Sequence, residues 1–377
     1  MSARSARPRV VVVGGGVLGT STAANLAREG AHVVLVTESR LGSGASGRSL
    51  SWLNSFGNFR SDEYHQLRVH GIDRYRTLAH RLGDKDHLRF DGGLTWPAPG
   101  QADTYRDHLR HMHDNGYAAQ WLAPDEVDEW TPGIDPAAVA PEGAIFNPGE
   151  GWVDLPWLVA LLADEVRSRG NRVIENTGPV RITVEGGRAT GINTGDGLRV
   201  DADAVVLATG PAVPSTLAEL GVTVADATSV ALLVKTRPVA HPLRAVLNTP
   251  RVSLRPTPDG AFAMDSDAAA AEVIGDEHSG YDVKDSTVED LLAEASSILA
   301  DHPQLEAEWF GVGPKPIPGD GDPVFGAVDE IAGLSVAFSH SGATLALIAG
   351  ELLAREVVTG SPSPLLASFR PGRFTKR

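Results

Sequence analysis

The chain of 377 residues contains no cysteine. Disulfides, thiolate metal ligands and a thioether bond to a cofactor are therefore excluded, and no other pattern predicts a metal site. No apolar run reaches the roughly 20 residues that a membrane-spanning helix needs, and residues 10–13 are too short for the apolar part of a signal peptide. We therefore expect a cytoplasmic protein without a membrane span.

Positive charge is also scarce. Lys and Arg number 33 against 48 Asp and Glu, which gives a formal net charge of −15. Nucleic acids and anionic membranes attract a basic surface, so neither is expected as a partner. Hydrophobic residues make up 42% of the sequence, which is enough for a large core, and the length favours two domains.

The strongest pattern lies near the start of the chain. An apolar run over residues 10–13 leads directly into Gly14, Gly16 and Gly19, at the spacing G-x-G-x-x-G. In such a turn the first glycine makes the tight bend, and the second lets the backbone approach a pyrophosphate. The third lets helix and strand pack closely. The turn therefore predicts a dinucleotide-binding site.

The residues that follow complete a strand–helix–strand unit. Residues 20–29 read as a helix closed by Gly30, and residues 32–37 read as a second buried strand. The free N–H groups of the helix N-terminus, around Val17 and Leu18, and the positive end of the helix dipole suit a pyrophosphate. This context within about 30 residues makes the glycine spacing a strong signal.

The pattern offers two candidates for the residue that contacts the ribose. An acidic residue at the end of the second strand usually has this role. Counting 23 positions from Gly14 reaches Thr37, whose hydroxyl bonds a ribose more weakly than a carboxylate does. Glu38 takes the role if the strand carries one extra residue, but a solvated turn residue is an equally good interpretation of Glu38. Ser39 and Arg40 follow it.

A second loop of small residues comes next, R-L-G-S-G-A-S-G-R over residues 40–48. Gly44, Ala45 and Ser46 let the chain lie against an extended ligand, and Arg48 can reach a phosphate. An NAD enzyme would normally start a second crossover helix here, so the loop favours FAD. Together with the glycine turn, it resembles the FAD-dependent D-amino-acid oxidase superfamily, which includes glycine oxidase, sarcosine oxidase and D-amino-acid dehydrogenase.

Later segments extend this resemblance over nearly the whole chain. The sequence G-W-V-D at residues 151–154, followed by an apolar-periodic helix over 156–169, is similar to the family's return into the cofactor domain. Residues 171–184 read as paired strands. Within them, Val180 matches the position whose backbone meets adenine in relatives.

Two further segments resemble flavin-binding parts of the family. Residues 201–210 read as an apolar strand that ends in A-T-G, and residues 334–338 read as a strand that leads through 340–344 into a helix. A helix N-terminus aimed at the flavin N1–C2=O edge stabilises the negative charge of reduced flavin. The predicted FAD contacts are therefore Gly14, Gly16, Val17, Leu18, Gly19, Thr37, Glu38, Ser39, Arg40, Gly44, Ala45, Ser46, Arg48, Val180, Ala208, Thr209, Gly210, Ser341, Gly342, Ala343 and Thr344.

The resemblance implies an α/β fold with a Rossmann-like FAD-binding domain and an inserted α+β substrate domain on a mostly antiparallel sheet. The FAD-binding domain is expected over 8–60, 146–225 and 310–377, and the substrate-binding domain over 61–145 and 226–309. In the inserted segments we expect helices over 62–81, 101–115 and 286–301, the last with Ser286 as N-cap in a capping box, and strands over 88–96, 229–236, 251–255 and 261–265.

Three residues are candidates for the chemistry. Glycine-oxidase-like relatives clamp the substrate carboxylate with an arginine in the segment G-x-R-P, and Lys315 occupies that position here. Lysine offers a point charge in place of a bidentate fork; a surface lysine in a turn is the competing interpretation. Arg255 is the alternative cation, or the member of a strand-end salt bridge. His340 lies beside the presumed flavin loop and has a suitable pKa for a general base.

The resemblance implies a reaction as well as a cofactor. The expected reaction is oxidation of the C–N bond of a small amino acid, N-alkyl amino acid or related amine by hydride transfer to flavin N5, giving an imine that water hydrolyses. Oxidation of a 2-hydroxy acid or another specialised small molecule is an alternative. A second alternative is an FAD-binding subunit that is inactive without a partner chain, and a homo- or hetero-oligomer fits either case. Without cysteine, FAD is expected to bind noncovalently.

The electron acceptor stays open between oxygen and another molecule. Sarcosine-oxidase-type relatives use a lysine near the flavin to speed the reaction with oxygen. The strand where we would seek it reads A-F-A-M-D over 261–265, and Asp265 has the wrong sign to stabilise superoxide. Trp52 and Asn54, just after the Arg48 loop, are further candidates to line the site, although core packing explains Trp52 equally well.

Overall fold

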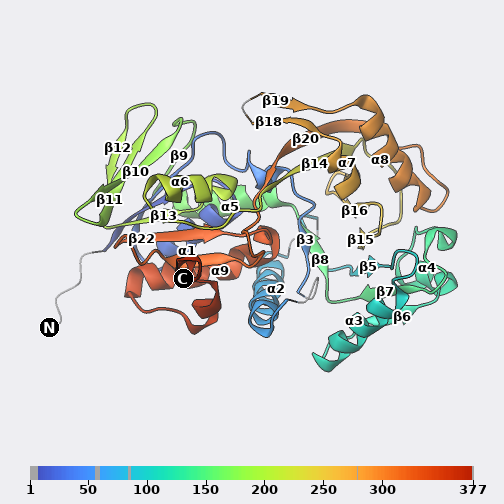
Figure 1. The fold of residues 1–377 in the computed structure, drawn as a ribbon. Helices are drawn as coiled ribbons and strands as arrows, with labels where there is room; N and C mark the ends of the chain where they lie inside the picture. The colour runs from blue at the N-terminus through green and yellow to red at the C-terminus, as the bar shows by residue number, and fades with distance from the viewer. Residues whose placement is uncertain (1–6, 56–59, 84–85, 278, 376–377) are drawn as a thin grey trace.

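Two β-sheet layers organise the computed structural model, which describes residues 7–55, 60–83, 86–277 and 279–375. Figure 1 shows a six-stranded sheet with its helices on one side of the molecule and an eight-stranded sheet on the other. The short strands β3 (Trp52–Leu53) and β8 (Gly151–Val153) lie between them and pair with each other.

The six-stranded sheet is parallel except at one edge. Its order is β21-β22-β13-β1-β2-β9, and β21 runs antiparallel to β22. Strand β1 lies between β13 and β2, so the glycine turn after β1 opens at the carboxyl edge of the sheet, where such folds bind ligands. The strands are β1 (Arg9–Val13), β2 (His32–Val36), β9 (Arg172–Ile174), β13 (Ala204–Leu207), β21 (Val324–Ala327) and β22 (Leu334–Phe338).

Helices and a small sheet cover the two faces of this layer. The apolar stripes of one group of helices form a common core with β1 and β2. A three-stranded sheet and α6 (Val213–Glu219) cover the other face. The helices of the first group are α1 (Val17–Arg28), α2 (Asp62–Leu82), α5 (Leu155–Ser168) and α9 (Gly342–Thr359), and the small sheet consists of β10 (Val180–Glu185), β11 (Arg188–Thr194) and β12 (Arg199–Asp201).

The eight-stranded sheet is antiparallel apart from the pair β15 and β5, which confirms the predicted fold class. Successive side chains of a strand point to opposite faces, and one face, with Leu232, Leu254 and Met264, packs in a core with α8 (Asp285–Ser297). In sheet order the strands are β20 (Ala307–Lys315), β14 (Ser229–Thr236), β17 (Phe262–Asp265), β16 (Ser253–Pro256), β15 (Val246–Asn248), β5 (Gly93–Thr95), β7 (Ala144–Asn147) and β6 (Gln120–Leu122).

Smaller elements complete the described chain. Strand β4 (Leu88–Arg89) pairs with β8, and a hairpin of β18 and β19 lies beside the end of the large sheet in Figure 1. The remaining elements are α3 (Ala102–Asp114), α4 (Val127–Trp130), α7 (Asp267–Ala271), β18 (Ile274–Asp276) and β19 (Gly280–Asp282).

Three local predictions are wrong. The single strand predicted over 88–96 is two strands in different sheets, separated by a turn in which Gly92 has a φ of 92°. Residues 171–184 do not pair with each other, because β9 joins β2 and β10 pairs with β11. Helix α8 begins at Asp285 with Lys284 as N-cap, so Ser286 lies inside the first turn and makes no cap.

The packing also places the border between the layers differently from the predicted segments. Helix α2 falls in the predicted substrate segment 61–145, yet it joins the core of α1 and α9. Strands β7 and β20 extend into segments assigned to the FAD domain, but both belong to the eight-stranded sheet. The apolar stripe of a helix does not reveal in the sequence which sheet it will meet.

Candidate active site

The glycine turn after β1 leaves no room for side chains. Gly14 has a φ of 118°, and its N–H donates to the carbonyl oxygen of Val36 at 2.8 Å. A Cβ at Gly14 would lie 2.2 Å from the oxygen of Ala208, and a Cβ at Gly19 would lie 1.9 Å from the oxygen of Gly14. The tight turn and the close helix packing that the spacing predicts are therefore both present.

Helix α1 presents an open N-terminus at this turn. Its N-cap, Gly16, makes no side-chain hydrogen bond, and its first turn contains no acidic residue. The N–H of Val17 donates to Ser46 Oγ at 3.0 Å, which ties the second loop to the first. Because the other N–H groups of a first helical turn have no intrahelical acceptors, this end suits a pyrophosphate.

The second loop folds back on the first. The N–H of Gly42 donates to the oxygen of Gly15 at 2.9 Å, and a Cβ at Gly47 would lie 2.4 Å from the oxygen of Gly42. A turn of 3₁₀ helix, η1 (Ala45–Gly47), follows and is preceded by Gly44. The small residues of this loop thus permit its close approach to the glycine turn.

Arg48 points from this loop toward the eight-stranded sheet. Its Nη1 donates to the oxygen of Ser43 at 2.7 Å. The side chain lies against Gly311 and Gly313 of β20, where an added Cβ would come within 2.8 and 2.4 Å of it. Burial lowers the pKa of Arg48, although Glu277 beside β18 opposes this. The contact of Arg48 with a phosphate stays a prediction.

The end of β2 carries both ribose candidates. The strand ends at Val36, and the next residue, Thr37, is buried against Gly15. A Cβ added at Gly15 would lie 2.8 Å from the Cβ of Thr37. Glu38 and the two residues after it, Ser39 and Arg40, are exposed. Both Thr37 and Glu38 stay predictions as ribose contacts.

The end of β13 returns to the glycine turn. Thr209 N lies 3.0 Å from the Cβ that Gly14 would carry. The hydroxyl of Thr209 is buried, and within the described residues it has no hydrogen-bond partner. Buried hydroxyls in folded proteins usually have a partner, so this one fits a contact with a bound molecule. Val180 begins β10 and pairs with Thr194; two residues before it, the N–H of Gly178 donates to the oxygen of Glu38 at 3.1 Å. The contact of Val180 with adenine stays a prediction.

Helix α9 presents a second open N-terminus. Its N-cap, Ser341, makes no side-chain cap, and its first turn, residues 342–344, contains no acid. Two tyrosines of α2 hold this end: Tyr64 Oη donates to Ser341 Oγ at 2.7 Å, and Tyr75 Oη donates to the oxygen of Ala343 at 2.5 Å. Helix α2 therefore positions the predicted flavin loop, a role that the sequence did not indicate.

These features fit an FAD molecule. The chain offers two helix N-termini whose N-cap residues make no side-chain hydrogen bond, a glycine turn that excludes any Cβ and, within the described residues, a buried hydroxyl without a partner. The turn after β1, the loop over 40–48, the end of β13 and the first turn of α9 would hold the cofactor.

Lys315 and His340 lie where the two layers meet. Lys315 ends β20, and His340 follows β22. His340 is solvent-exposed as a whole residue, yet desolvation by the surrounding protein lowers its pKa to about 4; the charges of Lys315 and Arg68 add to this shift, and Asp267 opposes it. Lys315 Nζ lies 3.7 Å from Asp267 Oδ1. His340 is therefore neutral near pH 7 in a positive field.

Arg255 is occupied by contacts within the protein. Its Nε donates to the oxygen of Leu50, and its Nη1 donates to the oxygen of Pro256 at 2.9 Å. The guanidinium lies 4.8 Å from the ring centroid of Trp152, and burial lowers the pKa of Arg255 to about 10. These contacts join the sheet to β8 and to the segment before β3, and we do not retain Arg255 as the substrate cation.

Arg68 belongs to the site although no sequence pattern indicated it. Its Nε and Nη2 donate to the backbone oxygen and Oδ1 of Asn54 at 2.9 and 2.7 Å, so Arg68 fixes a residue that was expected to line the site. Its charge also reaches His340 and Glu150. Arg68 lies on the polar side of an amphipathic helix, where an arginine in the sequence looks like a solvated residue.

Glu150 is a second residue near the site that no sequence pattern indicated. Its Oε2 accepts a hydrogen bond from Trp52 Nε1 at 2.8 Å, and its Oε1 accepts one from Asn147 Nδ2 at 3.1 Å. Burial raises the pKa of Glu150 to about 8, while these two bonds and the charge of Arg68 oppose that shift. Glu150 is thus a buried carboxyl between the layers, and Trp52 is bound to it by a polar contact.

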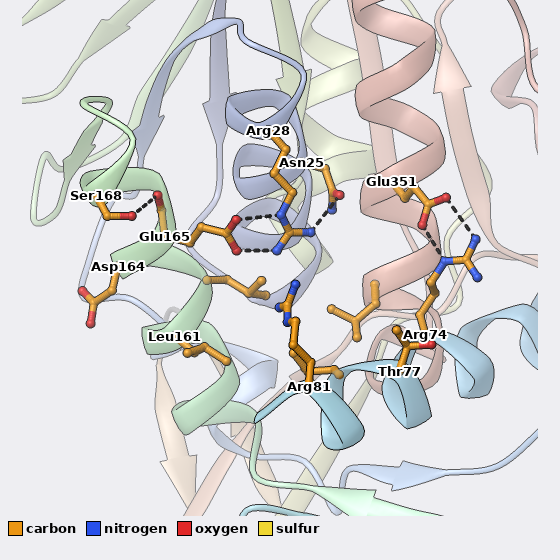
Figure 2. Close-up of a pocket in the computed structure, with 13 residues that line it drawn as sticks. Asn25, Arg28, Arg74, Thr77, Arg81, Leu161, Asp164, Glu165, Ser168 and Glu351 are labelled. Atoms are coloured by element: carbon orange, nitrogen blue, oxygen red, sulfur yellow. Dashed lines mark hydrogen bonds and ion pairs between the residues drawn. The ribbon is translucent and has the colours of Figure 1, made fainter. Parts of the chain in front are cut away.

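A cavity of about 390 Å³ lies between α1, α2, α5 and α9, away from the predicted site (Figure 2). Figure 2 shows two ion pairs on its walls: Arg28 Nε lies 2.7 Å from Glu165 Oε1, and Arg74 Nε lies 2.5 Å from Glu351 Oε2. These pairs tie α1 to α5 and α2 to α9. None of the residues predicted to contact FAD or substrate lines this cavity.

No group of three or more His, Asp or Glu in the described ranges is placed to hold a metal ion. No helix in the same ranges is long and apolar enough to cross a membrane.

Comparisons with known proteins agree with this geometry. Residues 9–356 match the family described as FAD dependent oxidoreductase. The chain is 28% identical over 364 residues to a glycine oxidase from Geobacillus kaustophilus, covering 92% of this chain and 91% of that protein. The crystal structure of glycine oxidase from the same organism superposes with a TM-score of 0.81 at 25% identity, covering 97% and 99% of the two chains.

A second solved structure shares the fold at lower identity. Iminodiacetate oxidase from Chelativorans sp. BNC1 gives a TM-score of 0.80 at 22% identity and covers 96% of this chain and 99% of its own. With the match over residues 9–356, the chain belongs to the family of FAD-dependent oxidoreductases. It is an enzyme, and FAD is its cofactor.

Proposed function

We propose that this enzyme oxidises the C–N bond of a small amino acid or N-alkyl amino acid to an imine, which water hydrolyses. Relatives named glycine oxidase and iminodiacetate oxidase support this substrate class. FAD, when bound, supplies the redox chemistry by accepting a hydride from the carbon that bears the amine. The observation that carries the proposal is the pair Lys315 and His340 at the junction of the two layers.

Lys315 anchors the substrate carboxylate in this proposal. The side chain is one-third exposed, and its neighbour Asp267 is fully exposed at 3.7 Å, which is longer than a hydrogen-bonded ion pair. An ion pair in water contributes little, so a carboxylate ligand can replace Asp267 at small cost. Arg68 adds a second positive charge to the same region.

His340 serves as a neutral polar neighbour of the substrate. With a pKa of about 4 it carries no charge at pH 7, so it does not compete with Lys315 for the carboxylate. Loss of a hydride from a neutral amine needs no general base at this position. The open N-terminus of α9 lies two residues after His340 and would stabilise the negative charge of the reduced cofactor.

Replacement of Lys315 by Met tests this assignment. We expect the dissociation constants of glycine and sarcosine, taken from anaerobic reduction of the holoenzyme flavin, to rise by ~10- to 100-fold while FAD stays bound. Lys284→Met removes an exposed lysine just before α8, beside the eight-stranded sheet, and so controls for the loss of one positive charge. Unchanged dissociation constants in Lys315→Met would refute the anchor.

A further inference from the structure

The eight-stranded sheet carries a row of polar residues on the face opposite its core. Asn248 pairs with Ser253 across β15 and β16, and Ser253 pairs with Asp265 across β16 and β17. Directly paired residues point to the same face. The neighbours Leu254 and Met264 point the other way, into the apolar core. The polar row therefore lies on the second face of the sheet.

This face is turned toward the cofactor layer. Arg255, two residues after Ser253 on the same face, donates to the oxygen of Leu50, which precedes β3 between the two layers and packs with Trp152 of β8. Leu233 pairs with both Asp265 and Gly311, and Gly311 packs against Arg48 of the second loop. Asp265 thus shares its face with residues that touch the FAD-binding loops.

The charges around Asp265 come from two elements. Lys315 on β20 favours the ionised form of the carboxyl, and Asp267 on α7 opposes it; His340, across the junction, responds to the same two residues. Burial is the largest effect and raises the pKa of Asp265 to about 6. Asp265 therefore changes charge in the range where a proton acceptor is useful near neutral pH.

The polar row accommodates both charge states of Asp265. Ser253 Oγ lies 3.1 Å from Asn248 Oδ1, and the Ser253 hydroxyl also bonds Asp265. When Asp265 is ionised, the hydroxyl donates to it, and an amide flip lets Asn248 donate to Ser253. When Asp265 is protonated, its proton goes to Ser253 and the hydroxyl turns to Asn248. In both states the Ser253 hydroxyl has one donor and one acceptor among its two neighbours.

We propose that Asp265 binds the ammonium group of the substrate and takes the proton that must leave before the C–N bond is oxidised. This inference rests on the proposed function. An ammonium has no lone pair to form a C=N bond, so one proton passes from nitrogen to the Asp265 carboxylate and leaves a neutral amine and a protonated Asp265. After loss of the hydride, the iminium is hydrolysed and Asp265 returns its proton to water. A 2-hydroxy acid has no cation for Asp265.

A pair of unreactive ligands tests the ammonium contact. 2-Aminoisobutyrate has no hydrogen on its α-carbon, so it cannot be oxidised, and isobutyrate differs from it by lacking the amine. We expect Asp265→Asn to weaken binding of 2-aminoisobutyrate to the holoenzyme by ~10- to 100-fold, measured calorimetrically, and to leave isobutyrate within about twofold. Asp267→Asn, which removes the other carboxylate near Lys315, should change the dissociation constants of both ligands by the same factor. Equal effects of Asp265→Asn on both ligands would overturn the proposal.

The pH dependence of flavin reduction provides a second test with amino acids that react. The wild-type rate constant should fall as the pH drops below the titration of Asp265. Asp265→Asn should be slower by at least ~100-fold and lose this acid limb, and Asp265→Glu should restore it. If amino acids reduce the flavin of the wild type and of Asp265→Asn with the same rate constant and pH profile, the role of Asp265 is refuted while the proposed function stands. If no amino acid reduces the flavin of the wild type, the proposed function itself is refuted, and the role of Asp265 falls with it.

Discussion

Glu150 makes the stability of this protein depend on pH in a way that one substitution should remove. The carboxyl is 4% exposed and accepts hydrogen bonds from Trp52 and Asn147. Burial raises its pKa from 4.5 to about 8. One pKa unit corresponds to about 1.4 kcal/mol, so the shift amounts to roughly 5 kcal/mol as an upper bound.

The sign follows from the direction of the shift. A carboxyl with a raised folded-state pKa binds its proton more tightly in the folded protein, so its contribution to stability is complete below pH 4.5. That contribution is lost as the pH rises to about 8. Glu150→Gln cannot titrate. The free energy of unfolding of the wild type should therefore fall by several kcal/mol relative to Glu150→Gln between pH 5 and pH 8.

Urea unfolding of the FAD-saturated proteins at pH 5, 6.5 and 8 measures this difference. Glu185→Gln removes an exposed carboxylate and corrects for the loss of one negative charge. A constant offset between wild type and Glu150→Gln across the three pH values would refute the reasoning. It would mean that Glu150 keeps an ordinary pKa despite its burial.

Two further substitutions separate cofactor binding from architecture. Gly19→Ala places a Cβ 1.9 Å from the oxygen of Gly14, so we expect a loss of about 3 kcal/mol and of FAD, read from unfolding midpoints and flavin absorbance. Ala27→Gly in the same helix should cost about 1 kcal/mol and keep FAD; equal flavin content in the two variants would contradict this. Arg255→Met leaves the oxygen of Leu50 unpaired and should lower stability by ~1–3 kcal/mol with unchanged sarcosine binding. A large rise in the sarcosine dissociation constant would restore Arg255 as a substrate contact.

The cofactor half of the fold could be predicted because its signals are local. The turn at Gly14 and Gly19 follows an apolar strand without interruption. Each glycine is required by a close backbone contact, either within the same strand–helix–strand unit or with the neighbouring strand β13. Apolar runs also gave the strand over 229–236 its observed bounds. These features depend on short sequence distances, where spacing and periodicity are informative.

The substrate half depends on long-range pairing that no local pattern reveals. Asp265 faces the cofactor layer because β17 pairs with β14 and β16, and the sequence alone left only its charge to interpret. Arg68 reaches the site because α2 packs on α9. The sequence left Arg255 open as a substrate cation or as part of a strand-end salt bridge, and the structure buries it against Trp152. In each case the sequence showed the chemical type of the side chain, but it did not show which residue the side chain contacts in the folded protein.

The most direct test of the account is an anaerobic titration of the purified holoenzyme, followed by the visible spectrum of the flavin. Glycine, sarcosine, D- and L-amino acids and 2-hydroxy acids are added in turn. The account predicts that at least one amino acid or N-alkyl amino acid abolishes the oxidised-flavin band and that 2-hydroxy acids leave it unchanged. Bleaching by a 2-hydroxy acid alone, or by none of these compounds, would contradict it.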